Sequence, residues 1–238
     1  EVAADDIGIC FPTSLTTKCH GCYFPTLDNE QCFQLHFPLP ESLADQGNWG
    51  TLSDKVGKEE CRRLAQQLEA DGWDEKYLKP LSHVTHAVRI GFCQLKPKLE
   101  HWVFSKVVLV GDAAHPPVPY TGQGAQMGLE DAGTLAILLQ RLCLDENGKF
   151  RLDNFDDAMK IYEQIRIPRV AEICQVSRKW GDCQQQRSES KRSARVTEEK
   201  IRRDVFFHET LPKLFPGVSY DYKAHVAEVL NARPIKEL

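Results

Sequence analysis

One stretch, residues 106–142, constrains the fold of this 238-residue chain more than any other part of it. It begins with an apolar run at 107–110, continues through Gly111-Asp112 and a loop rich in proline and glycine, and ends in a segment with helically spaced apolar residues. A strand, a glycine-acid turn, a loop and a helix, in that order, build a ligand site at the carboxyl end of the strand. We therefore expect an α/β fold organised around this unit.

The residue types at the two ends of the loop predict what the ligand carries. Residues 107–110 are apolar at every position, as in a parallel strand covered on both faces. Gly111 permits a sharp turn, and the carboxylate of Asp112, which only accepts hydrogen bonds, suits the hydroxyls of a sugar or polyol. Segment 122–124, Gly-Gln-Gly, opens the helix, where free N–H groups and the helix dipole favour an anionic or electron-rich group. The residues expected to point inward from this helix are Met127, Leu129, Ala132, Leu135, Ala136, Leu138 and Leu139.

The string GDAAHPPVPYTGQGAQMGLEDA resembles the second flavin-binding motif of the FAD-dependent aromatic hydroxylases, the family of salicylate and para-hydroxybenzoate hydroxylases. The motif is matched at its spacing by segment 111–115, Pro119, segment 122–124 and segment 130–132. Over 106–142 the residues themselves match strictly. Over 5–95 the likeness is limited to the order of the expected strands and helices. Looser matches fall at Trp102, Tyr162, Arg166 and Arg169.

The resemblance implies a cofactor site and a role for several of its residues. Asp112 would hold a ribitol hydroxyl of FAD, and the helix start would stabilise the negative charge of the reduced flavin ring. His115 is interpreted as fixing the loop rather than as a general base, and Gln126 stands where the family often has Asn. The resemblance names no catalytic residue and no metal ligand. The implied cofactor-binding residues are Gly111, Asp112, Pro119, Gly122, Gln123, Gly124, Ala125 and Gln126.

The reaction that the resemblance implies is monooxygenation of an aromatic or other electron-rich small molecule. In that family NAD(P)H reduces FAD, O2 adds at the flavin C4a position, and the resulting hydroperoxide transfers one oxygen. An epoxidase or a halogenase of the same flavoprotein fold is an alternative. The motif identifies neither the substrate nor the preference for NADH or NADPH.

Two features of that family do not occur in this sequence: a G-x-G-x-x-G segment for the FAD pyrophosphate and the family's Asp-Gly motif. We therefore predict an incomplete, Rossmann-like FAD/NAD(P)-binding domain that on its own binds FAD weakly or not at all. The first hypothesis is the C-terminal part of a longer monooxygenase, which the opening Glu1 favours. The second is a truncated, non-catalytic homologue that serves as an interaction module.

The remaining segments predict a three-part division of the chain. Residues 1–104 would be part of a substrate-binding domain with a mixed β-sheet, 105–145 the second FAD-binding segment, and 146–238 a C-terminal helical region. Strands are expected over 5–39, including a hairpin, and over 84–95. Phe33, Leu35 and Phe37 line one face of that sheet and are interpreted as sheet core rather than substrate contacts. Helices are expected from Ser53 to Ala70, from Asn154 with a kink or restart at Pro168, and from Tyr222 to Leu230.

Composition narrows the class of partner. A formal net charge of -4 predicts no attraction to nucleic acid, and no apolar run is long enough to span a membrane. The basic segment 187–203 is interpreted as a solvated helix face. Nine scattered cysteines predict reduced thiols in a reducing, cytoplasmic compartment, with Cys19 and Cys22 as sheet cysteines rather than zinc ligands. The expected partner is a small-molecule substrate, and the oligomeric state is open.

Overall fold

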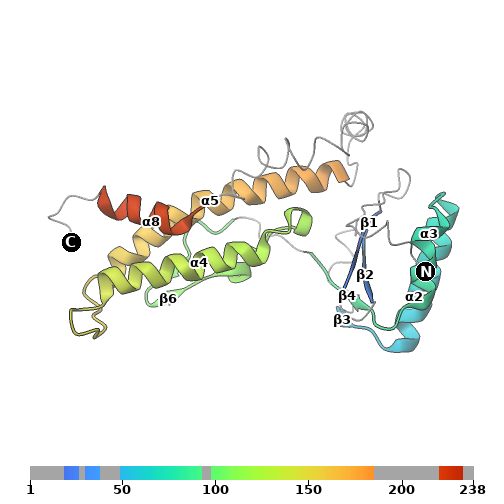
Figure 1. Ribbon diagram of the computed structural model, residues 1–238, viewed down its shortest axis with the longest axis horizontal. Helices are drawn as coiled ribbons and strands as arrows, with labels where there is room; N and C mark the ends of the chain where they lie inside the picture. The colour runs from blue at the N-terminus through green and yellow to red at the C-terminus, as the bar shows by residue number, and fades with distance from the viewer. Residues whose placement is uncertain (1–18, 27–29, 38–48, 93–97, 185–219, 233–238) are drawn as a thin grey trace. The chain divides into compact units, whose positions relative to one another are not determined.

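The computed structural model describes residues 19–26, 30–37, 49–92, 98–184 and 220–232 (Figure 1). These residues belong to two compact units, one within residues 19–91 together with 182–184 and the other formed by 92–181 together with 220–232. The basic segment 187–203 and the first part, 5–18, of the strand region expected over 5–39 lie outside the described residues. The three-part division predicted from the sequence stays a prediction.

The first unit is built on a β-hairpin. Strand β1, His20–Pro25, pairs antiparallel with β2, Gln31–His36, and sets Cys22 opposite Gln34, so the predicted hairpin is confirmed. One face of the hairpin packs on a buried cluster of Cys19, Leu68 and Leu81. The side chains of Phe33, Leu35 and Phe37 pack against this cluster, which confirms them as sheet core.

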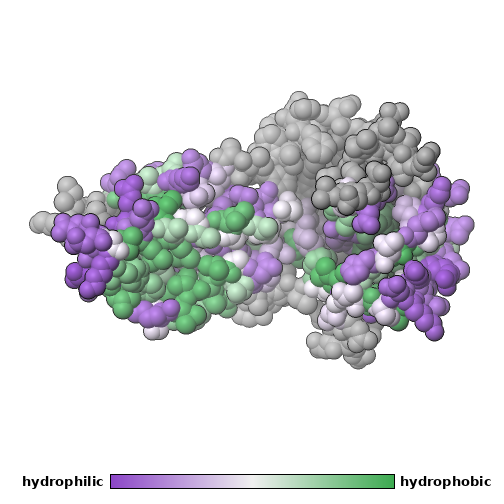
Figure 2. Space-filling model, turned by 60° about the horizontal axis from the view of Figure 1, so that its bottom comes forward, coloured by the Kyte–Doolittle hydropathy of each residue, from purple (hydrophilic) through white to green (hydrophobic). Residues whose placement is uncertain are grey.

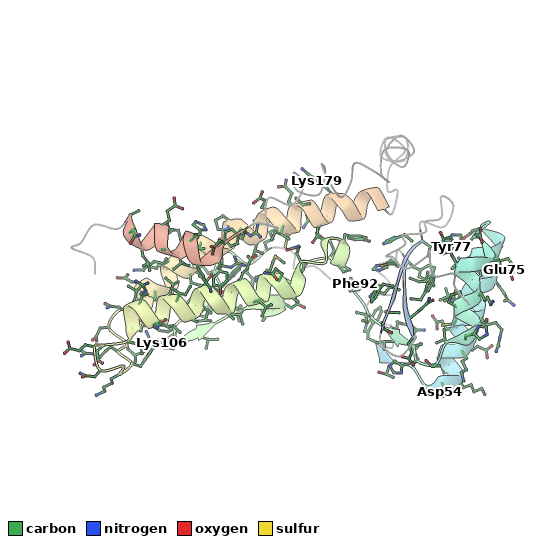
Figure 3. The ribbon with its side chains drawn as sticks, viewed as in Figure 1. Asp54, Glu75, Tyr77, Phe92, Lys106 and Lys179 are labelled. Carbon is green, nitrogen blue, oxygen red and sulfur yellow. The ribbon has the colours of Figure 1, made fainter. Side chains whose placement is uncertain are left out.

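Helix α2, Asp54–Ala70, was predicted as a helix, and its fully buried Leu68 belongs to the cluster on which the hairpin packs. Ser53 occupies the N-cap position, but its side chain makes no capping hydrogen bond. The helix ends at Asp71, and Gly72 follows with a φ of 79°. Helix α3, Glu75–Leu78, and the 3-10 turn η2, Lys79–His83, complete this layer (Figure 3).

The strand expected over 84–95 is much shorter than the alternation of its residues predicts. Only β4, Val88–Arg89, is a strand, and it pairs antiparallel with β3, Gly50–Thr51; residues 93–97 lie outside the described part. Strand β3 offers two residues before α2 begins at Asp54, so the partner is too short to extend the pairing. Alternation alone does not make a strand without a partner of matching length.

The second unit begins with a short antiparallel ribbon. Strand β5, Val103–Phe104, pairs with β6, Val107–Val108, because Ser105, with a φ of 56°, turns the chain back on itself. The expectation of a parallel strand covered on both faces is therefore wrong for the described residues, in which β6 pairs with β5 alone. The side chain of Val107 is 61% exposed and that of Val110 41% exposed.

Helices form the rest of this unit. Two 3-10 turns, η3 at Gly111–Ala113 and η4 at Pro119–Thr121, lead into α4, Gly124–Leu138, which ends in a π-helical turn, η5, Leu139–Cys143. Helix α5 spans Phe155–Gln184 and continues through Pro168 instead of restarting there. Helix α8, Tyr222–Asn231, was predicted and packs against α4.

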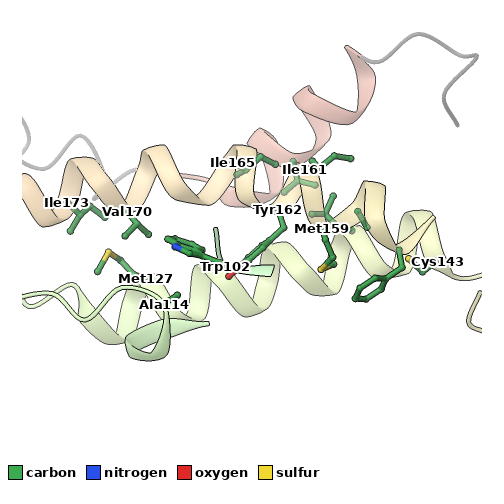
Figure 4. Close-up of a cluster of buried hydrophobic side chains, with 14 of the residues drawn as sticks. Trp102, Ala114, Met127, Cys143, Met159, Ile161, Tyr162, Ile165, Val170 and Ile173 are labelled. Carbon is green, nitrogen blue, oxygen red and sulfur yellow. The ribbon is translucent and has the colours of Figure 1, made fainter. Parts of the chain in front are cut away.

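The main core of the molecule lies between α4 and α5 (Figure 4). Helix α5 contributes one apolar face at helical spacing, with Ala158, Ile161, Tyr162 and Ile165 all buried. They meet Met127 and Leu138 of α4 and the indole of Trp102 in one cluster. The turn η3 contacts α4 as well, so this core supports the loop that the sequence analysis singled out.

The inward face of α4 differs from the prediction. Met127 and Leu138 are buried, but Leu129 is 67% exposed, and Ala132 and Ala136 are exposed too. The acids Glu130 and Asp131 are buried in their place, because basic side chains of α5 pair with them. Apolar side chains consequently gather on one face of this unit (Figure 2), and the exposed ones of β5, β6 and α4 include Phe104, Val107 and Leu129.

Among the described residues, no helix is both long enough and apolar enough to cross a membrane.

Candidate functional site

The first part of the site is the turn that carries Asp112. The amides of Ala114 and His115 both donate to the carbonyl of Gly111 at 2.9 Å, which closes the turn η3. Gly111 has a φ of 57°, and a Cβ there would lie 3.9 Å from the Cα of Gly128 in α4. A glycine suits this position because its backbone is left-handed and approaches the helix closely. Asp112 is exposed beside this anchored glycine.

The second part is the start of α4. Gly122, with a φ of 64°, ends the turn η4, and its amide donates to Pro119 at 3.2 Å. Gln123 is the N-cap residue, and the helix runs from Gly124. The amides of a helix's first turn have no intrahelical acceptor and carry the positive end of the helix dipole. Pro119, Gly122, Ala125 and Gln126 are exposed around these amides.

A buried carboxylate, Asp131, holds the first part in place. Its Oδ2 accepts from the amide of Gly111 at 2.9 Å and is 2.6 Å from Nε2 of His115, and its Oδ1 accepts from Nε of Arg166 at 2.7 Å. Its side chain is 0% exposed. Burial alone would raise the pKa of Asp131, but the hydrogen bonds from His115, Arg166 and Gly111 outweigh burial and lower it.

Two arginines of α5 balance the buried acids. Arg166, also 0% exposed, donates from Nη1 to Glu130 at 2.6 Å and from Nη2 to the carbonyl of Met127 at 3.2 Å. Arg169 donates to Glu130 at 3.1 Å and lies 4.3 Å above the ring of Tyr220. Burial opposes the charge of Arg166, yet its bond to Asp131 and the charges of both acids raise its pKa. Asp131 and Arg166 therefore both stay ionised inside the unit.

His115 has the surroundings of a structural residue. Its side chain is 4% exposed, bonded to Asp131 and packed against Trp102 with ring centroids 4.8 Å apart. Its Nδ1 is buried and has no hydrogen-bond partner among the described residues. A general base must reach the proton it removes. This geometry therefore agrees with the interpretation of His115 as a residue that fixes the loop.

Side chains of helix α5 also form hydrogen bonds with backbone groups of the site segment. Glu163 accepts from the amides of Trp102 and Val103, and the hydroxyl of Tyr162 donates to the carbonyl of Leu109 at 3.1 Å. Near the other end of the helix, Ser177 donates to the carbonyl of Val118.

Tyr162, Arg166 and Arg169 match the family's sequence loosely but had no predicted role, and no sequence feature pointed to Glu163. A helical pattern shows which residues face inward but not which backbone group each one meets. The bond of Ser177 to the carbonyl of Val118 likewise had no sequence signal.

The site offers the groups that the implied cofactor needs. Asp112 presents an exposed acceptor, and a Cβ added at Gly122 would meet nothing within 4 Å, so there is open space beside this glycine, just before the helix start. Buried hydrogen bonds at Gly111 and Met127 hold the Asp112 turn and the start of α4, and they leave the exposed side of both free for a ligand. These residues fit the ribityl and ring half of a flavin: an acceptor for hydroxyls and free amides for an electron-rich ring edge.

Comparison with known proteins finds relatives that bind FAD. Residues 51–177 match the FAD binding domain family. The 3-amino-4-hydroxybenzoate 2-monooxygenase PtmB3 of Streptomyces platensis is 42% identical over 80 residues, which are 34% of this chain and 18% of that protein. The 3-hydroxybenzoate 6-hydroxylase of Klebsiella oxytoca is 33% identical over 135 residues, 57% of this chain and 30% of that protein.

A solved structure shows the same fold. Klebsiella pneumoniae HpxO, complexed with FAD and uric acid, superposes with a TM-score of 0.60 at 22% identity, over 79% of this chain and 43% of that one. The chain thus spans less than half the length of these relatives. The family match covers more than half of the chain and includes the whole site segment. The resemblance seen in the sequence is therefore confirmed, and this chain belongs to the FAD-binding domain family.

Proposed function

We propose that this chain supplies the ribityl and isoalloxazine part of the FAD site in a Rossmann-like flavoprotein monooxygenase. The observation that carries the proposal is the pairing of an exposed carboxylate at Asp112 with the open amino-terminal turn of α4. The buried bonds of Asp131 and Arg166 hold the two parts. The eight residues from Gly111 to Gln126 predicted to bind the cofactor remain the proposed contacts.

The proposed reaction is hydroxylation of an aromatic or similarly electron-rich small molecule with NAD(P)H and O2. Bound FAD would supply the redox and oxygen-transfer chemistry. This chain would bind and orient the flavin, because none of its site residues is placed as a general acid or base. Two of the relatives are named for hydroxylation of substituted benzoates, which supports an aromatic substrate.

The experiment uses a probe matched to the part of the site that the chain contains. Riboflavin has the ring and ribityl chain but no ADP, so the proposal expects weak binding of riboflavin, with the same affinity as FAD, and no competition from ADP. Amide chemical shifts of the full chain would be followed by NMR during titration with each of the three. Shifts at Gly122, Gly124, Ala125 and Gln126 support the proposal, and unmoved amides at saturating riboflavin and FAD overturn it.

A matched pair of variants tests the role of Asp112. A hydrogen bond to a charged group contributes about 1.5–3 kcal/mol, so Asp112→Asn should weaken riboflavin binding about tenfold or more. Glu146→Gln removes the same charge from an exposed turn residue of the same unit and should leave binding unchanged. Equal effects of the two variants would show that Asp112 acts through net charge alone.

A further inference from the structure

The two parts of the proposed site meet at one buried side chain that touches neither of the exposed surfaces. Arg166 bonds through Nε to Asp131, whose other oxygen holds the amide of Gly111, next to Asp112. Through Nη2 the same guanidinium bonds to the carbonyl of Met127, in the first turn of α4. One planar group therefore bridges the Asp112 turn and the helix start.

The chemistry of arginine is needed for this bridge. A guanidinium presents its donors in a rigid plane, so fixing two of them fixes the third. Here Nε, Nη1 and Nη2 point at Asp131, Glu130 and Met127 respectively, at 2.7, 2.6 and 3.2 Å. A lysine keeps the charge but carries it on a flexible stem as a point, and it cannot hold three acceptors in one plane. The arrangement fixes geometry as well as neutralising charge.

Asp131 passes this constraint to the loop in two places. Its Oδ2 is shared between the amide of Gly111 and the imidazole of His115, the first and last residues of the segment GDAAH. Both ends of the segment are thus tied to one carboxylate, and Asp112 lies between them. A shift of Asp131 would move both ends of the segment. These bonds are buried, so a group that loses its bond to Asp131 cannot replace it with a bond to water.

We propose that Arg166 is a positioning residue that sets the spacing between the Asp112 carboxylate and the amides at the start of α4. The proposal rests on the function proposed above, since it assigns that spacing to the flavin. Arg166 is 0% exposed, and its hydrogen bonds reach the two parts through Asp131 and Met127.

The test compares Arg166→Lys with Arg169→Lys in the full chain. Both arginines lie on α5, both are buried and both bond to Glu130, so the control disturbs the same ion cluster. Arg166→Lys should speed hydrogen exchange at the Gly111 amide, weaken the hydrogen-bonded signal of the His115 ring N–H, and reduce riboflavin affinity about tenfold. Arg169→Lys should lower the unfolding midpoint and leave these three measurements near their original values.

The outcomes separate this proposal from the proposed function. If the unaltered chain binds no riboflavin, the flavin assignment fails, while the Gly111 and His115 signals still report whether Arg166 fixes the loop. If Arg166→Lys changes those signals and the affinity no more than Arg169→Lys does, Arg166 has only a structural role and the proposal is overturned. Should Arg166→Lys not fold, Asp131→Asn, which keeps the side-chain shape, replaces it with the same expected results.

Discussion

Asp131 is a fully buried carboxylate in the second unit, and its burial affects the stability of the chain. A fully buried carboxylate is unfavourable unless charge and hydrogen bonds compensate it, and here two side chains and one amide do so. Its pKa in the folded chain is lowered, so its contribution to stability is present above the pKa of an unfolded aspartate, about 3.9, and is lost as the pH falls through the folded value.

We therefore expect Asp131→Asn to destabilise the chain by about 3–5 kcal/mol at pH 7, as removal of one partner of a buried ion pair does. The difference from the unaltered chain should begin to shrink below about pH 4, where the carboxylate of the unfolded chain becomes protonated, and it should disappear once the pH is below the lowered pKa of the folded chain. Urea unfolding of both chains at pH 7 and at pH 3 measures this. A difference independent of pH would mean that the charge of Asp131 contributes nothing.

A second residue, Cys19, should be chemically inert. Burial, aided by the negative charge of Asp71, raises the pKa of its thiol to about 12. Thiolates are the reactive form, so the folded chain at pH 8 should leave Cys19 unlabelled by a maleimide while the half-buried Cys22 reacts. Peptide mass mapping of native and urea-unfolded samples checks this, since unfolding should make Cys19 label as well. Fast native labelling of Cys19 would show that the hairpin opens readily.

At the scale of elements, α8 is fastened to α4 by a contact that requires a glycine. A Cβ on Gly133 would lie 2.5 Å from the ring of Tyr222, so Gly133→Ala must displace that ring. Alanine otherwise favours a helix over glycine by about 1 kcal/mol. We expect Gly133→Ala to destabilise the chain, and the same change to be neutral or stabilising when Tyr222 is already alanine. Thermal unfolding of the four chains of this double-mutant cycle measures the coupling, and additive effects would contradict the contact.

Two leucines of α4 that differ in burial give another matched pair of substitutions. Leu138 is 0% exposed, so Leu138→Ala should cost about 2–5 kcal/mol. Leu129 is 67% exposed on the same helix, and Leu129→Ala should stay within about 0.5 kcal/mol. Urea unfolding of the two variants decides between the observed inward face and the one predicted from apolar residues alone. An equal cost for both would restore the predicted face.

These elements also show how far the sequence determines the fold. The hairpin, α2, α5 and α8 were predictable because turn residues and a single apolar face identify each one locally. The inward face of α4 was not, because the helix is apolar on several sides and the buried face is selected by Arg166 and Arg169, about 40 residues later. The loop of the site was predictable from its motif, whereas the bonds that support it depend on tertiary contacts that no local pattern encodes.

For the whole molecule, the separation into two units leads to the last prediction. Each unit has its own buried cluster, one around Leu68 with Trp73 packed on it and one around Leu138 that includes Trp102. Leu68→Ala should therefore lower the urea midpoint of the transition reported by Trp73 and leave the midpoint reported by Trp102 unchanged. Leu138→Ala should lower the Trp102 midpoint and leave the Trp73 midpoint unchanged. Chains keeping one of these tryptophans, with the others changed to phenylalanine, give separate fluorescence curves in urea.

If both tryptophans report a single shifted transition in each variant, the two clusters unfold as one, and the unit division has no energetic meaning. If the transitions separate, every proposed cofactor contact from Gly111 to Gln126 belongs to the unit reported by Trp102. Riboflavin should then raise the urea midpoint of the Trp102 transition, since a ligand stabilises only the folded state that binds it. The Trp73 transition should not move, which makes the second curve an internal control for the flavin assignment.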